Sequence, residues 1–286
     1  MHEFEIIDRY FARGLERDDV LLGIGDDAAL VRVEPSRPVV TAVVTLCGEV
    51  HAEFQSSGGA FAAALVRSAL NRLAARGAAP AWLTLALSIP EPDEDWLGEF
   101  SECLHALIAT YGAALVGGDT VRAPLTATLV AHGVAAPTPA DLGTPRIGDD
   151  IYITGTLGRA LLFGPGDAGA PPPRVDAGLA AIPFATAAGD IRESLAATLV
   201  RLLDPAGLGA VLEHSRLPLA DTAGDPLGRA SAKRFVENSP DAELCWVIGP
   251  HTERPFKEAM AALDTPCTRI GRVGAEPGVQ MDGTPL

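Results

Sequence analysis

Hydrophobic positions recur along the chain with two periods, and each period predicts a different secondary structure. Apolar residues spaced three or four positions apart predict amphipathic helices, and this spacing occurs in residues 2–15, 59–77, 93–112 and 190–203. Short runs rich in Val, Ile, Leu and Thr predict strands, and these runs are residues 38–50, 81–89, 113–120, 125–136, 151–158, 242–249 and 269–274. Because helices and strands interleave throughout, the pattern predicts a mixed α/β fold.

A polar, proline-bearing stretch, PTPADLGTPRIGDD at residues 137–150, separates two groups of predicted elements. Such composition is typical of a domain boundary, and 286 residues are enough for two domains of ordinary size. We therefore predict an N-terminal domain over residues 1–137 and a C-terminal domain over residues 138–286. The glycines and prolines of residues 164–174 predict a loop, which is either a lid or a passive connection.

Charge and cysteine content exclude several classes of function. The net charge is −15, from 37 acidic and 22 basic residues, which argues against nucleic acid as a partner because phosphate backbones require basic surfaces. The cysteines are widely separated and form no CxxC pair, as expected for a reducing compartment. The N-terminus resembles no signal peptide, and no apolar run is long enough to span a membrane. We therefore expect a cytoplasmic protein.

Carboxylates framed by glycine supply the candidate chemistry. Asp26 and Asp27 lie in GIGDDAAL, which is either a solvated turn or a Mg²⁺ site, since paired carboxylates suit hard cations. Asp119 lies in VGGDT, where a strand is expected to run into a glycine-rich turn that could approach a phosphate. Asp190 and Glu193 stand three apart at the head of a predicted helix, either as ligands on one face or as charges that favour the helix N-terminus.

The familiar nucleotide-binding motifs are missing: the sequence contains neither GxxxxGK[ST] nor GxGxxG, nor the protein-kinase signatures. Five segments nevertheless match one known family, namely EFEIIDRYF, GIGDDAAL, GAAPAWLTLALSIPEPDEDWL, YGAALVGGDTVRAPLTATLVAHG and GDDIYITGTLG. With these segments the chain resembles the thiamine-monophosphate kinase family, which belongs to the superfamily of aminoimidazole ribonucleotide synthetase. The resemblance extends over nearly the whole sequence.

The resemblance implies a fold and an activity. The fold would have two domains: an N-terminal domain that binds ATP and Mg²⁺ and forms a β-barrel core across a homodimer, and a C-terminal α+β domain. The activity would be phosphorylation of thiamine phosphate to thiamine diphosphate, with the γ-phosphate of ATP passing directly in line to the acceptor. ATP and Mg²⁺ would be the cofactors.

Roles for single residues also follow from the resemblance. Asp27 and Asp119 match catalytic carboxylates that bind the metal. Gly118 and Tyr111, with Asp119, match contacts to the nucleotide. His51 matches a contact to thiamine phosphate.

The match is imperfect at other metal positions. Asp190 matches a further metal-binding Asp, and Glu193 stands where the family has another Asp. Val44 and Arg72 replace acids that the family uses for metals, and Arg192 replaces a serine. A guanidinium within ~4 Å of Mg²⁺ repels the ion by several kcal/mol at an effective dielectric constant of about 20.

Two classes of function follow from these observations. The first is a kinase of thiamine phosphate that uses ATP and Mg²⁺. The second is a catalytically impaired paralogue that serves as a nucleotide-binding or regulatory dimer. A related enzyme that acts on another small phosphorylated molecule fits both sets of observations.

Overall fold

The computed structural model describes residues 3–13, 16–51, 57–137, 140–164, 170–220 and 229–286. The chain divides into two compact units. Unit 1 comprises residues 1–73 and 78–138, and unit 2 comprises residues 74–77 and 139–286. Helices and strands alternate in both, which confirms the mixed α/β class. In the described parts of the chain, each helix is too short or too polar to cross a bilayer.

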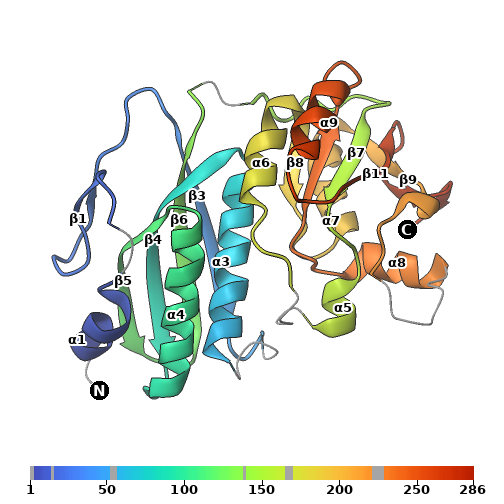
Figure 1. Cartoon of the computed structure of the whole chain (residues 1–286). Coiled ribbons are helices and arrows are strands. Elements are labelled where there is room, and N and C mark those ends of the chain that lie inside the picture. Colours follow the sequence, from blue (N-terminus) through green and yellow to red (C-terminus); the bar gives the residue numbers. More distant parts are fainter. Residues whose placement is uncertain (1–2, 14–15, 52–56, 138–139, 165–169, 221–228) are drawn as a thin grey trace. The chain divides into compact units, whose positions relative to one another are not determined.

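Unit 1 is built on a four-stranded sheet in the order β3-β6-β4-β5 (Figure 1). Strands β4 and β5 run parallel, whereas β6 is antiparallel to both β3 and β4. The bounds are β3 (Val39–Cys47), β4 (Ala78–Ile89), β5 (Ala114–Arg122) and β6 (Thr126–Ala135). The short strands β1 (Val20–Leu22) and β2 (Leu30–Val31) pair with each other.

Two long helices, α3 (Gly58–Ala74) and α4 (Glu94–Thr110), lie side by side against one face of this sheet (Figure 1). Burial alternates along β6: Ala127, Leu129 and Ala131 are fully buried, whereas the residues between them are only partly buried. Helix α4 begins where the sequence predicts, because the Asp93 carboxylate accepts hydrogen bonds from the N–H groups of Asp95 and Trp96.

The N-terminal segment forms α1 (Glu3–Ile6), which continues into the π-helical turn η1 (Ile7–Phe11). The predicted helix over residues 2–15 is therefore shorter than expected within the described residues. In the π-helical turn, the Ala12 N–H donates to the Ile7 carbonyl over 2.8 Å, a pattern that recurs at functional sites.

Unit 2 contains a seven-stranded sheet in the order β13-β12-β9-β11-β7-β10-β8 (Figure 1). Its pairs are antiparallel except for β12 with β9. The strands are β7 (Asp150–Thr154), β8 (Ala185–Asp190), β9 (Gly209–Leu212), β10 (Leu244–Ile248), β11 (Cys267–Gly274), β12 (Gly278–Met281) and β13 (Thr284–Pro285). The helices are α5 (Arg159–Phe163), α6 (Val175–Ala181), α7 (Leu195–Leu203), α8 (Arg229–Asn238) and α9 (Glu253–Ala261), with single turns η2 (Ile182–Phe184), η3 (Asp204–Ala206) and η4 (His214–Arg216).

Both faces of this sheet are buried, and strand β10 shows why its sequence is apolar throughout. Cys245 and Val247 face a core that includes Leu199 of α7. Leu244, Trp246 and Ile248 face a second core, which includes Phe256 of α9. A strand covered on both faces has no polar positions to alternate with.

Candidate functional site

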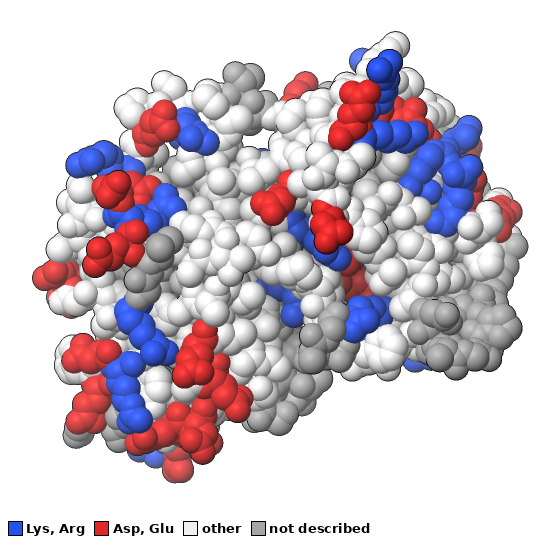
Figure 2. Space-filling model, in the orientation of Figure 1, with Lys and Arg blue, Asp and Glu red and all other residues white. Residues whose placement is uncertain are grey.

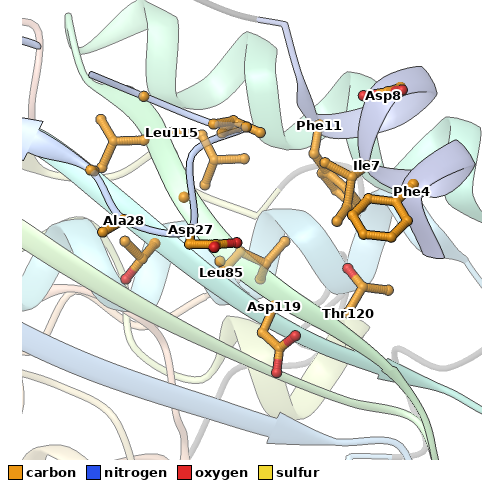
Figure 3. A pocket seen from close by; sticks show the side chains of 18 residues that line it. Phe4, Ile7, Asp8, Phe11, Asp27, Ala28, Leu85, Leu115, Asp119 and Thr120 are labelled. Atoms are coloured by element: carbon orange, nitrogen blue, oxygen red, sulfur yellow. The ribbon is translucent and has the colours of Figure 1, made fainter. Parts of the chain in front are cut away.

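A cavity of about 640 Å³ opens in unit 1 and is called here the N-terminal pocket (Figure 3). Its walls come from the N-terminal helix (residues 4–11), the β1–β2 connection (residues 23–29), β4 (residues 84–85) and β5 (residues 115–120). The size is typical of a site for a small ligand. Both the GIGDDAAL and the VGGDT segments, which the sequence singled out, therefore border one space.

The VGGDT segment is strand and not turn, so the expectation of a turn there is wrong. Strand β5 continues through Gly117 and Gly118, and its pairing with β4 shifts by one residue between Leu83 and Thr84. Just after this bulge the two backbones lie close: a Cβ on Gly118 would lie 1.9 Å from the Leu85 carbonyl oxygen. Bulges of this kind often redirect side chains beside active sites.

Asp27 and Asp119 both border the N-terminal pocket, and their carboxylates are shown in Figure 3. Asp27 adopts a left-handed backbone with φ of 58°, which Asp tolerates better than most residues. Asp26 precedes it in the same tight connection, where its carbonyl accepts the Ala28 N–H over 2.6 Å. The segment is therefore a turn, as one of the two interpretations expected, and this turn carries Asp27 to the pocket. The alternative interpretation, a Mg²⁺ site, stays a prediction.

The polar side of the pocket fits a metal–nucleotide complex. Its lining includes Asp8, Asp27 and Asp119 and no Lys, Arg or His among the described residues. Across the described parts of the chain, no cluster of three or more His, Cys, Asp and Glu could hold a metal alone. Mg²⁺ commonly takes one or two carboxylates and completes its shell with phosphate oxygens and water. Asp27 and Asp119 suit that arrangement.

Tyr111 and His51 are not among the residues that line the pocket. Tyr111 ends helix α4, where its N–H donates to the Ile108 carbonyl over 3.2 Å. The Nδ1 atom of His51 lies 3.1 Å from both the backbone nitrogen and the carbonyl oxygen of Cys47, at the end of β3. Their expected roles stay predictions.

Asp190 and Glu193 do not share a helix face, so that part of the sequence interpretation is wrong. Asp190 ends strand β8, and helix α7 begins only after Ser194, whose hydroxyl accepts the Ala197 N–H over 3.1 Å. The Asp190 carboxylate forms ion pairs with Arg192 at 3.4 Å and with Arg201 at 3.6 Å. Glu193 is exposed. Whether either carboxylate binds a metal stays a prediction.

The two substituted metal positions in unit 1 lie next to each other. The Arg72 guanidinium of α3 donates a hydrogen bond to the Val43 carbonyl of β3. Val44, the next residue, is buried on the helix-covered face of the sheet. A guanidinium therefore stands beside the strand position where the resemblance led us to expect an acid.

Two buried acids in unit 2 were not recognised as structural from the sequence. Asp241 accepts hydrogen bonds from the N–H groups of Gly158 at 2.8 Å and Ala160 at 2.9 Å, and burial raises the pKa of its carboxyl. Glu243 forms a bidentate pair with Arg174, with both contacts at 2.7 Å. The segment DAELC contained both acids, but only their burial shows that they hold neighbouring chain segments in place.

Comparison with known proteins identifies relatives along the whole chain. Residues 25–135 match the model of the AIR synthase related protein, N-terminal domain. The chain is 32% identical to the thiamine-monophosphate kinase of Haemophilus influenzae, with 100% of this chain and 95% of that protein covered. It is 34% identical to the thiamine-monophosphate kinase of Salmonella typhimurium, over 96% of this chain and 91% of that protein.

Solved structures agree with these relatives. The crystal structure of thiamine-monophosphate kinase from Stenotrophomonas maltophilia K279a superposes with a TM-score of 0.86 at 35% identity, over 100% of this chain and 98% of that one. AaThiL complexed with AMPPCP and TMP shares the fold, with a TM-score of 0.73 at 22% identity over 92% of this chain and 89% of that one. Because its sequence identity to these kinases, at 32–35%, extends over 96–100% of its length, the chain belongs to the thiamine-monophosphate kinase family.

Proposed function

We propose that this protein transfers the γ-phosphate of ATP to thiamine monophosphate and so makes thiamine diphosphate in the cytoplasm. The observation that carries the proposal is the N-terminal pocket, where Asp27 and Asp119 border one cavity in a chain related over its full length to kinases of this name. The transfer forms a bond from a phosphate oxygen of thiamine monophosphate to the γ-phosphorus. The bond from that phosphorus to the β–γ bridging oxygen breaks, and ADP leaves.

ATP would enter the pocket as its magnesium complex. The lining carries three acids and, among the described residues, no base, so free ATP would be repelled. Bound Mg²⁺ would neutralise the phosphates and polarise the transferred group. Asp27 and Asp119 hold this complex in the proposal, and the close packing of Gly118 against β4 fixes the position of Asp119. No acid or base is required from the protein, because positioning and charge carry most phosphoryl transfers.

The remaining site assignments rest on the family resemblance alone. We assign Tyr111 to the nucleotide and His51 to thiamine monophosphate on that basis. Before a metal could bind at Asp190, with or without Glu193, the guanidinium groups that pair with Asp190 would have to move away.

We also propose that the protein is a homodimer in which the open faces of two unit 1 sheets meet. On the face of the sheet opposite α3 and α4, Val43 is 51% exposed and Val121 is 49% exposed. Thr45 and Thr128 pair across β3 and β6 on the same face, with 2.9 Å between their hydroxyl oxygens. Apolar residues left open in this way favour association. Light scattering coupled to size exclusion measures the mass directly, and a mass of one chain would contradict the proposal.

The decisive test is product formation by the purified protein with ATP, Mg²⁺ and thiamine monophosphate, followed by chromatography of thiamine diphosphate. We expect product only with Mg²⁺, and we expect Asp119→Asn to abolish it. Asp264→Asn removes an exposed acid of unit 2 and should leave the rate unchanged.

The alternatives give different results in the same experiment. Binding of Mg-AMPPCP without product from thiamine monophosphate would indicate an enzyme for another phosphorylated acceptor. Absence of nucleotide binding would indicate a paralogue that has lost the chemistry, an outcome that Arg72 beside β3 would explain. The full-length identity to named kinases favours the kinase over both alternatives.

A further inference from the structure

The N-terminal helix (α1 with η1) is docked on helix α4 through one backbone carbonyl. The carbonyl oxygen of Tyr10 accepts a hydrogen bond from the Ser101 hydroxyl at 2.5 Å and lies 3.1 Å from Nε2 of His105. Ile6, Tyr10 and Phe11 are buried around this point, at 4–5% exposed. The polar contacts therefore join the end of the N-terminal helix to the middle of α4, where water has little access.

The same helix forms one wall of the N-terminal pocket. Phe4, Ile7, Asp8 and Phe11 of this helix line the cavity (Figure 3). The contacts with α4 determine where this wall lies. A change that loosens the helix from α4 therefore also changes the pocket.

The contact with Tyr10 fixes the protonation state of His105 while the helix is docked. A carbonyl oxygen only accepts hydrogen bonds, so Nε2 of the imidazole has to carry a proton. The other ring nitrogen, Nδ1, is buried and, among the described residues, has no hydrogen-bond partner. A second proton would create a charged N–H there without an acceptor, which costs far more than leaving the nitrogen bare. The docked helix therefore requires a neutral imidazole.

The charges around the imidazole also oppose its protonation. Burial lowers the pKa of the ring below 6.5, and the guanidinium of Arg13 lowers it further, although the hydrogen bond to the backbone carbonyl raises it. The charged groups on α4 and on the elements packed against it do not reverse this effect. Arg9 pairs with Glu94 at 2.9 Å, Glu102 is exposed, and the charge of Arg67 on α3 acts on the thiol two residues before the ring.

We propose that His105 is a pH-sensitive contact that releases the N-terminal helix from α4, and with it a wall of the N-terminal pocket, when the imidazole gains its second proton. This inference rests on the proposed function only for its effect on nucleotide binding. Once the helix is released, the ring meets water and titrates near its ordinary pKa of about 6.5. Docking therefore keeps its full strength above about pH 6.5 and weakens as the pH falls below that value. Between pH 7.5 and 5.5, the ratio of released to docked helix should rise about tenfold.

Hydrogen exchange of the full chain, measured by mass spectrometry, tests the proposal. The protection factor of residues 3–13, which corrects for the intrinsic pH dependence of exchange, should fall about tenfold between pH 7.5 and 5.5. In His105→Gln, the side-chain amide can still donate to the Tyr10 carbonyl and does not titrate, so protection should be equal at both pH values. His251→Gln removes an exposed histidine of unit 2, and this matched control should respond as the wild type does.

NMR of the imidazole distinguishes a pH-sensitive contact from a histidine that only fills space. At pH 7.5 the His105 ring should be neutral with its proton on Nε2, and its protonation should coincide with the loss of helix protection. A ring that gains its second proton while residues 3–13 keep their protection would overturn the proposal. Equal loss of protection in the wild type and in His105→Gln would overturn it too. If His105→Gln is unprotected already at pH 7.5, the NMR titration of the wild type decides by the same criterion.

Mg-AMPPCP measures the link between the helix and the pocket. A ligand that binds only the docked form favours docking by the factor 1 + [L]/Kd. Free Mg-AMPPCP at ten times its Kd, as measured by calorimetry, should therefore restore the protection that residues 3–13 lose at pH 5.5. Protection that bound Mg-AMPPCP leaves unchanged would overturn this link. A wild type that does not bind Mg-AMPPCP at either pH would overturn the proposed function, and exchange without ligand would still decide whether His105 releases the helix.

Discussion

Replacing each of the two neighbouring glycines of β5 by alanine should give opposite results. A Cβ at Gly118 would lie 1.9 Å from the Leu85 carbonyl oxygen and 2.8 Å from its carbon, both backbone atoms of β4. A Cβ at Gly117 meets its nearest atom, Cγ2 of Thr84, at 3.9 Å, an ordinary contact. Neither glycine has a positive φ, so steric space alone separates them.

The size of the stability loss in Gly118→Ala follows from how far strands β4 and β5 have to move apart. Relief of the Gly118 contact requires a shift of about 1 Å or more between β4 and β5, and overpacking of this kind costs about 1–3 kcal/mol. At about 2–4 °C per kcal/mol for a chain of this size, Gly118→Ala should melt about 2–12 °C lower than the wild type. Gly117→Ala should be neutral or up to about 1 kcal/mol more stable, because alanine restricts the unfolded chain.

Differential scanning calorimetry of the two variants and the wild type is the assay. In Gly118→Ala, we expect unit 1 to melt at a lower temperature than in the wild type. The affinity for Mg-AMPPCP should also fall, because Asp119 is displaced. Since the chain has two units, their transitions have to be resolved before a free energy is assigned. Equal melting of the two alanine variants would refute the argument that the bulge between β4 and β5 demands glycine at position 118.

Three further predictions concern buried groups. Arg174→Met should cost about 3–5 kcal/mol of unfolding free energy in urea because it leaves Glu243, 3% exposed, without its bidentate partner; Arg174→Met with Glu243→Met should recover part of the loss, and a single variant as stable as the wild type would contradict this. Burial lowers the pKa of His105 below its ordinary value of 6.5, so the folded chain holds it neutral and stability should fall as the pH drops below about 6.5; His105→Gln should lessen that fall, as measured by unfolding between pH 8 and 5.5. Burial raises the pKa of Cys245 to about 12, so mass spectrometry after treatment with a thiol reagent at pH 8 should find Cys245 unmodified in the native protein and modified after unfolding.

Part of the fold follows from the hydrophobic pattern because some elements, such as α4 and β6, lie against a core on one face only. Helix α4 and strand β6 show the expected periods, and Asp93 marks the helix start in the sequence itself. The interpretation was wrong where tertiary contacts override local signals. Residues 190–193 have helical spacing, yet Asp190 completes the ladder between β8 and β10, and the cap formed by Ser194 delays the helix.

The candidate site was predictable in its chemistry and not in its geometry. The glycines beside Asp27 and Asp119 indicated two sites of close backbone approach, but only the fold brings both carboxylates to one cavity. The expected turn at VGGDT is strand because these residues pair with β4, and no local signal in the sequence indicates either this pairing or its register shift. The place of Phe4 at the pocket was equally hidden, because a helical period does not reveal which apolar residues will line a cavity.

The Lys and Arg side chains on the face shown in Figure 2 are interspersed with Asp and Glu. Residues 4–11 of the N-terminal helix line the pocket, so the end of the chain that carries an affinity tag matters for laboratory work. Phe4 is the fourth residue of the chain, and any fusion joined ahead of Met1 would therefore begin within a few residues of the pocket wall. A tag at the other end, after Leu286, lies in unit 2 and leaves the pocket wall in its own sequence context. Recombinant protein for nucleotide binding should carry its tag at the C-terminus or have it removed.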